Sequence, residues 1–297
     1  MRTAIDRTFV GLTFVATLII LAMLGVIIGN VIFHGKDRLS LEFITTAPEN
    51  GMTAGGIFPA IFGTALLVLL MSLAAVPFGV LVAIYFAEYS RRDSRLYRWT
   101  RMAVNNLAGV PSIVFGLFGL GFFIQTIGRG IDRGLYGGQL VYGQPSILWA
   151  AMTMAVLTLP VVIITVEEAL RAVPQDYREA SLALGATRLQ TIVRVILPQA
   201  WGGVMTGAIL AISRGAGEVA PVLFTGAAYF LPYLPTHAND QFMQLGYHVY
   251  VLATQSPNVE ASKPILFSTV LVLLTLTFLL NVTAMLIRNR MRQWATR

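Results

Sequence analysis

Two charged residues stand alone in a long apolar stretch. Val195–Leu234 carries no charge except Arg214 and Glu218, whose spacing of four places them on one face of a helix. A charge inside a bilayer is costly, so such residues are kept for a reason. The planar guanidinium of arginine binds phosphate oxygens in pairs. The pair therefore suggests an anion site in which Glu218 competes for Arg214. The alternatives are a structural ion pair between helices and a contact of Glu218 with another chain.

Three uncharged polar residues are weaker candidates for a substrate pathway. Ser112, Asn105 and Asn106 fall near the start of an apolar segment, where hydroxyl and amide groups could line a path. Contacts between packed helices explain such residues equally well.

The other titratable residues predict no metal or acid–base site. His34, His237 and His248 lie far apart in segments expected outside the membrane, which favours interfacial roles over metal ligation. Glu167 and Glu168 end an apolar segment, where solvent exposure is the default. With no nucleophile–base pair in view, we expect no catalytic residues and disfavour a membrane-embedded enzyme.

The distribution of charge predicts six membrane-spanning helices. Of the 297 residues, 56% are hydrophobic and 12% charged. Five windows lack charge entirely: Thr8–Phe33, Asn50–Ala87, Met102–Gly128, Gly134–Val166 and Pro264–Ile287. A helix of about 20 residues crosses a bilayer, so each window can hold one span, and Val195–Leu234 holds another. We expect an all-α polytopic membrane protein with one transmembrane domain over residues 1–297.

Local patterns place the third span in more detail and predict one additional short helix. The third span is expected at Val104–Ile127, with Pro111 near its start. Between the last two spans, Phe242, Leu245, Val249 and Leu252 recur at helical spacing, which predicts a short helix lying in the outer interface.

Basic residues predict the orientation. With the N-terminus inside, cytoplasmic segments hold 15 of the 21 Lys and Arg residues and outer segments hold 5. This bias places both termini in the cytoplasm. The charged run after Phe33 lacks a small-residue cleavage pattern, so the first apolar segment is expected to be retained as a helix. The net charge of +7 then reflects topology, not nucleic-acid binding.

The cytoplasmic segment 167–199 predicts a helix–turn–helix. Pro174 and Asp176 suit a first helical turn, and Gly185 supplies a left-handed residue that ends that helix. Thr187 can cap the second helix, and Pro198 is expected to stop it. Two further expectations concern its side chains. Apolar residues should pack the elbow, namely Leu182, Ile192, Val193 and Ile196, and basic residues should stay solvated, namely Arg178, Arg188 and Arg194.

The same segment resembles the coupling element of type I ABC importer membrane subunits. That element reads Glu-Ala-Ala, three residues, Gly, nine residues, Ile-x-Leu-Pro. The matching residues here are Glu179, Ala180, Ser181, Gly185, Leu197 and Pro198. Ser181 replaces the second alanine and Val195 the isoleucine, and both keep small or branched character. The resemblance implies that the loop enters a cleft of a nucleotide-binding subunit; a purely structural hairpin is the alternative.

The chain has no site for ATP of its own. A P-loop requires Gly-Lys followed by Ser or Thr, but Lys36 precedes Asp37 and Lys263 precedes Pro264. We therefore expect no cofactor in this chain, with ATP and magnesium bound by a partner ATPase.

Further segments resemble the PstA-type permeases of phosphate ABC importers over essentially the whole chain. They are Asn106–Gly116, Glu168–Pro174, Arg214–Thr225 and Tyr247–Pro257. The resemblance implies a bacterial inner-membrane subunit that imports phosphate by alternating access. It also implies a PstC-type sister permease, two PstB-type ATPase subunits, a PstS-type binding protein and a link to phosphate starvation. Transport of molybdate or sulfate, or a mainly phosphate-sensing signalling role, are the alternatives.

The predicted orientation is testable with single cysteines, because the native chain contains none. A membrane-impermeant thiol reagent should label Ser94→Cys only from the cytoplasmic side and Asn239→Cys only from outside. Labelling of Ser94→Cys from outside would overturn the six-helix order.

Overall fold

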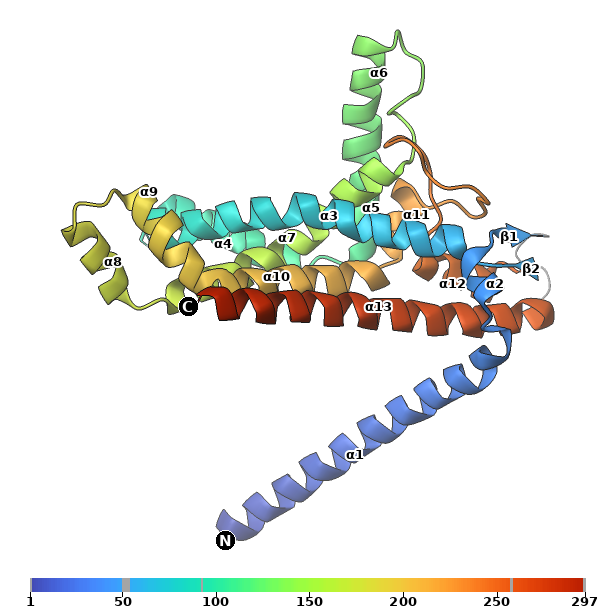
Figure 1. The fold of residues 1–297 in the computed structure, drawn as a ribbon, viewed down its shortest axis with the longest axis horizontal. Coiled ribbons are helices and arrows are strands. Elements are labelled where there is room, and N and C mark those ends of the chain that lie inside the picture. The colour runs from blue at the N-terminus through green and yellow to red at the C-terminus, as the bar shows by residue number, and fades with distance from the viewer. Residues whose placement is uncertain (1, 50–53, 92, 257–258, 296–297) are drawn as a thin grey trace.

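Six long apolar helices form the protein. The computed structural model describes residues 2–49, 54–91, 93–256 and 259–295. Within these residues, the helices long and apolar enough to cross a membrane are Asp6–Arg38, Phe58–Tyr89, Ser112–Leu135, Ile147–Ala172, Arg188–Gly217 and Ser262–Arg290. This confirms the predicted all-α architecture with six spans (Figure 1).

Four helices build the core. α7 (Ile147–Ala172) lies between α3 (Phe58–Ile84) and α10 (Leu197–Gly217), and α13 (Val259–Ala295) packs against α10 (Figure 1). Small residues allow close approach: a Cβ at Gly79 of α3 would lie 2.6 Å from Cγ1 of Val162. Close backbone packing of this kind is how helices associate where no hydrophobic effect drives them together.

The first helix, α1 (Arg2–Gly35), diverges from the core (Figure 1). It meets α13 at one end, where the Ser268 hydroxyl donates to the Gly35 carbonyl at 2.7 Å. A Cβ at Gly35 would lie 2.8 Å from the Phe267 carbonyl oxygen, so glycine permits this contact.

Short elements follow α1 at the same end. They are η1 (Lys36–Arg38), α2 (Leu41–Thr45) and a two-stranded antiparallel sheet of β1 (Pro48–Glu49) and β2 (Ala54–Gly55). Figure 1 shows them at the end opposite to α8 (Gln175–Ala183) and α9 (Arg188–Thr191). The end formed by α8 and α9 is called the coupling-loop end below.

The third span, predicted at Val104–Ile127, was wrong at both ends, because the helix runs from Ser112 to Leu135. Residues 104–108 belong to a separate helix, α4 (Arg95–Ala108), and the span begins at α5 (Ser112–Phe118) and continues through η4 (Gly119–Gly128) and α6 (Arg129–Leu135). Pro111 explains the break, because it lacks an N–H and disfavours helical backbone at the residue before it.

The predicted stop at Pro198 was also wrong. α9 continues through the π-helical segment η5 (Ile192–Ile196) into α10, so the second coupling helix and the fifth span are one helix. A proline clashes with the carbonyl four residues earlier. The wider π-turn ends two residues before Pro198 and gives the local adjustment that a proline inside a span requires. Among the described residues, η4 and η3 (Tyr85–Tyr89) are also π-helical, and η3 ends the second span.

The short helix predicted between the last two spans packs its apolar face against protein, while much of the loop before it is exposed. α11 (Ala220–Thr225) is followed by a loop and by α12 (Leu245–Thr254). Phe242, Leu245 and Leu252 are buried, and Leu245 and Leu252 pack in a core with residues of α3 and α13. The helical spacing was correct, but the apolar face contacts protein, which the period alone could not distinguish from lipid.

A buried carboxylate fastens the hairpin after the third span. Asp132 accepts backbone N–H bonds from Val141 at 3.1 Å, Tyr142 at 2.8 Å and Gly143 at 2.7 Å. Hydrogen bonds to a charged acceptor are stronger than neutral ones, and the three amides lose their partner if it is removed.

Replacing Asp132 with Ala should therefore lower the free energy of opening this hairpin by about 2–3 kcal/mol. Hydrogen exchange at the amides of residues 141–143 should become faster. Asp37 is exposed, so the control variant Asp37→Ala should leave the exchange of these amides unchanged. Unchanged exchange in Asp132→Ala would contradict this role.

Candidate functional site

The turn of the predicted coupling element is confirmed. α8 ends at Ala183, and Gly185 has φ of +83°, the left-handed conformation expected of it. Thr187 begins α9 with a capping box: its side chain accepts from Gln190 N–H, and Gln190 Oε1 accepts from Thr187 N–H at 2.8 Å. The elbow is thus fixed by local hydrogen bonds and one glycine.

The two faces of this elbow differ. Ile192 and Ile196 are buried, as predicted, but Leu182 and Val193 are exposed. Other exposed apolar residues of the loop are Tyr177, Leu184 and Leu189. The loop therefore exposes several large apolar side chains in the single chain.

The residues of the coupling signature lie along this elbow. Glu179 and Ala180 are exposed on α8, and the Ser181 hydroxyl lies 2.9 Å from the Thr191 hydroxyl across the turn. Leu197 is partly buried and Pro198 exposed, both at the start of α10.

Arg178 is not solvated, contrary to the sequence prediction. Its side chain is 14% exposed and pairs with Glu88, which is 8% exposed, through an Nη2–Oε1 contact of 2.7 Å. Nη2 also donates to Leu170 O at 2.8 Å, and Nη1 donates to Val173 O at 2.7 Å. The error arises because Glu88 lies 90 residues away in the sequence.

Glu167 is also buried instead of solvated. Its side chain is 2% exposed and lies between Arg101 of α4 and Arg171, whose Nη2 is 2.7 Å from Glu167 Oε1. The same Nη2 donates to the Tyr97 hydroxyl at 2.9 Å. The network fastens the amphipathic helix α4 to the end of α7 that enters the coupling loop.

Arg214 and Glu218 lie at the end of a helix. α10 ends at Gly217, and Glu218 has extended backbone, so the two residues do not share one continuous helical face as predicted. Arg214 Nε still lies 3.5 Å from Glu218 Oε1, with side chains 33% and 22% exposed in the single chain. The guanidinium is therefore accessible, and it lies in the last helical turn, where the helix dipole favours a cation.

Two hydrogen bonds next to this pair were not predicted from the sequence. Gln244, at the start of α12, is buried and donates through Nε2 to the Glu218 carbonyl at 3.5 Å. Ser213 donates to Asn281 Oδ1 of α13. No sequence signal identifies either contact, because both partners come from distant segments.

The three other pathway candidates are separated, and Asn106, like Asn105, is exposed on α4. Ser112 is the first residue of α5, and α5 packs on α11, the helix that follows Glu218; a Cβ at Gly116 would lie 3.0 Å from Pro221 Cα. Asn105 is exposed on α4, outside the third span. The structure thus places the helix of Ser112, but not Asn105, beside the segment after the charged pair.

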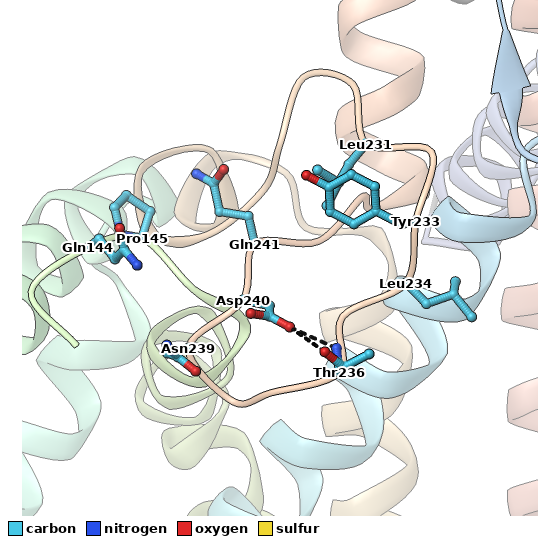
Figure 2. A pocket seen from close by; sticks show the side chains of 9 residues that line it. All are labelled: Gln144, Pro145, Leu231, Tyr233, Leu234, Thr236, Asn239, Asp240 and Gln241. Carbon is cyan, nitrogen blue, oxygen red and sulfur yellow. Dashed lines mark hydrogen bonds between the residues drawn. The ribbon is translucent and has the colours of Figure 1, made fainter. Parts of the chain in front are cut away.

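A cavity of about 570 Å³ opens at the end opposite to the coupling loop (Figure 2). Its lining residues are Gln144, Pro145, Leu231, Tyr233, Leu234, Thr236, Asn239, Asp240 and Gln241. Backbone N–H bonds from His237 and Thr236 lower the pKa of Asp240, which keeps it ionised. The lining contains this carboxylate and no cation, so the cavity is unsuited to an anion, unlike the Arg214 site.

The three histidines differ in environment. His34 and His237 are exposed, but His248 is buried within α12, and burial lowers its pKa to about 4. The expected interfacial role is therefore wrong for His248, which is neutral at physiological pH.

The chain matches known transport proteins. Residues 75–293 match the family model "Binding-protein-dependent transport system inner membrane component". The phosphate transport system permease protein PstA of Haemophilus influenzae is 31% identical over 85% of this chain and 83% of that protein. PstA 1 of Mycobacterium tuberculosis is 41% identical over 57% of this chain, a match that spans 51% of that relative. The predicted resemblance to PstA-type permeases is confirmed.

Solved structures support the same fold. A bacterial alginate ABC transporter, solved with an alginate-pentasaccharide-bound periplasmic protein, aligns with a TM-score of 0.65 at 17% identity, covering 93% of this chain and 94% of that one. This likeness concerns the fold alone. With the family match over most of the chain, the protein belongs to the binding-protein-dependent transport system inner membrane components, as a membrane-embedded transport subunit and not an enzyme.

Proposed function

We propose that this chain is the PstA-type subunit of an ATP-driven phosphate importer and forms half of its translocation pathway. The observation that carries the proposal is the match to the Haemophilus influenzae permease over most of both chains. The accessible guanidinium of Arg214 supports an anionic substrate independently.

The proposal includes three kinds of partner. A PstC-type sister permease completes the pathway, two PstB-type ATPase subunits bind ATP and magnesium, and a PstS-type binding protein delivers phosphate. The lack of a Gly-Lys-Ser/Thr sequence supports a separate ATPase, and the exposed apolar face of the coupling loop supports its docking there.

The arrangement of the two sites supports alternating access as the mechanism. Movement of the ATPase at the coupling loop shifts the helices that carry Arg214. The guanidinium binds phosphate oxygens in pairs when it is free of Glu218, and the re-formed ion pair releases the anion. Gln244, next to Glu218, lies where α12 meets this site.

We place the protein in the bacterial inner membrane with both termini in the cytoplasm. The basic residues concentrated in the segments of the coupling-loop end support this orientation.

Another tetrahedral oxyanion is a second candidate substrate. The fork of Arg214 presents the same donors to sulfate or molybdate as to phosphate. Competition of each oxyanion with labelled phosphate uptake separates these substrates.

Phosphate uptake should depend on the planar shape of the Arg214 side chain as well as on its charge. Arg214→Lys keeps the charge but loses the planar fork, so phosphate uptake should fall on the order of tenfold, the effect of losing about 1.4 kcal/mol. Arg214→Gln should be worse, because Glu218 then lacks its partner. Uptake into reconstituted vesicles, normalised to membrane expression, is the measurement.

The double variant Arg214→Gln/Glu218→Gln separates substrate contact from a structural pair. A structural pair predicts that removing both charges restores expression and uptake together. A substrate contact predicts normal expression without uptake, and full recovery of uptake would refute it.

Gly185→Val should uncouple transport from ATP hydrolysis. Space around Gly185 is open, but a β-branched residue resists its φ of +83° at a cost of about 1–2 kcal/mol. We expect an assembled membrane subunit whose ATPase association or stimulation is lost, measured by copurification and ATP hydrolysis. Gly185→Asn, which tolerates this conformation, is the matched control and should retain activity. Normal uptake by Gly185→Val would remove the argument.

A further inference from the structure

Arg178 links three segments at the coupling-loop end. It lies on α8, directly before Glu179, and its guanidinium donates to both carboxylate oxygens of Glu88 at 2.7–3.3 Å. The carbonyls of Leu170 and Val173 accept from the same side chain. One side chain therefore joins the coupling helix, the end of the second span and the end of the fourth.

These contacts divide into two kinds. Leu170 lies in the last turn of α7 and Val173 directly follows that helix, whose final carbonyls lack partners within the helix, so Arg178 serves there as a cap. Glu88 belongs to η3, at the end of the second span, and Arg178 contacts its side-chain carboxylate instead of a helix-end carbonyl. The ion pair with Glu88 therefore has a different role from the carbonyl contacts.

The pair spans a gap that is otherwise loosely packed. A cavity of about 230 Å³ lies among α8, the end of the second span and the α9–η5 segment, and Glu88, Arg178 and Ile192 are among its lining residues. No other hydrogen bond or ion pair between α8 and the second span occurs among the residues that the structure describes. Dispersion contacts across a void are weak, so the ion pair is the stiff connection.

The other paths from α8 to the second span are indirect. Val173 leads into α7, where Arg171 Nη2 donates to the Phe86 carbonyl at 3.4 Å. The Ser181–Thr191 contact leads into α9, where the Arg188 guanidinium lies 5.9 Å from the centre of the Tyr89 ring. Among the described residues, Arg178 and Glu88 therefore form the direct polar link between α8 and the second span.

We propose that Arg178 is a positioning residue that, through Glu88, makes the second span move together with the coupling helix. The inference rests on the proposed ATP-driven transport. The low exposure of both side chains makes the pair resistant to screening by salt, as a mechanical link requires. A bidentate contact also fixes the relative orientation of the guanidinium and the carboxylate, in addition to the distance between them.

The test uses the complete importer in vesicles, with the phosphate-loaded binding protein, and measures phosphate transported per ATP hydrolysed. Glu88→Gln removes the charge but leaves the carbonyl contacts of Arg178 intact, so it tests the link without disturbing the cap. Arg178→Gln removes both. We expect the ratio to fall about tenfold in each variant, with ATPase copurification unchanged, which corresponds to a coupling energy within the range measured for contacting residues.

Two further variants sharpen the result. The double variant Arg178→Gln/Glu88→Gln should be no worse than Arg178→Gln, because both changes break one contact. Arg98→Gln removes an exposed arginine of α4 on the same side of the protein and should leave the ratio unchanged. A wild-type ratio in Glu88→Gln, or additive losses in the double variant, would overturn the proposal.

A second readout does not depend on the substrate. Spin labels on Tyr85→Cys and Ala183→Cys report the distance between the end of the second span and α8. This distance should stay constant between nucleotide-free and ATP-bound complexes, and should change between them once Glu88→Gln is added. A distance that already changes without Glu88→Gln would refute the link. Absence of phosphate transport by the wild-type complex would instead refute the proposed function and leave this readout intact.

Discussion

The interior of a bilayer offers no water to peptide groups, so every crossing segment must satisfy its own backbone. This constraint explains the continuity of the spans. Pro77 and Pro160 lie inside α3 and α7 without ending them, and the π-helical η5 precedes Pro198. Buried hydroxyls obey the same rule: Thr64 and Thr153 donate to carbonyls four residues earlier. Polar side chains are thereby buried without needing water.

The break in the helix after α10 is an exception to this continuity. Gly217 ends the helix, Glu218 is extended and α11 begins at Ala220, so carbonyls at the end of α10 lose their helical partners. Irregular backbone at membrane depth is tolerated where it is buried in protein or lines a cavity. Gln244 satisfies the Glu218 carbonyl, and Arg214 occupies the negative end of the α10 dipole. The helix end thus creates the place where a charged pair is stable and accessible.

The sequence predicted features that depend on neighbouring residues and failed on those that depend on distant ones. Gly185 and Thr187 act within one turn, so their roles were readable, as was the apolar length of each span. Arg178 and Glu167 were assigned to solvent because their partners are far away in the chain: Glu88 precedes Arg178 by 90 residues. Ser112 and Asn105 were grouped by proximity, and the helix break at Pro111 separated them. Charge and hydropathy define which residues enter a membrane, but not which residues they meet.

The charged residues inside the fold differ in how firmly they are held. Glu167 is enclosed by two arginines, and Glu88 receives a bidentate contact, so separating either pair would leave a buried charge uncompensated. Arg214 and Glu218 share a single contact of 3.5 Å and remain partly exposed, so solvent or another anion can replace one partner at low cost. The proposed function requires both kinds of pairing, because a rigid pair at the coupling loop transmits movement and an exchangeable pair at Arg214 releases the substrate.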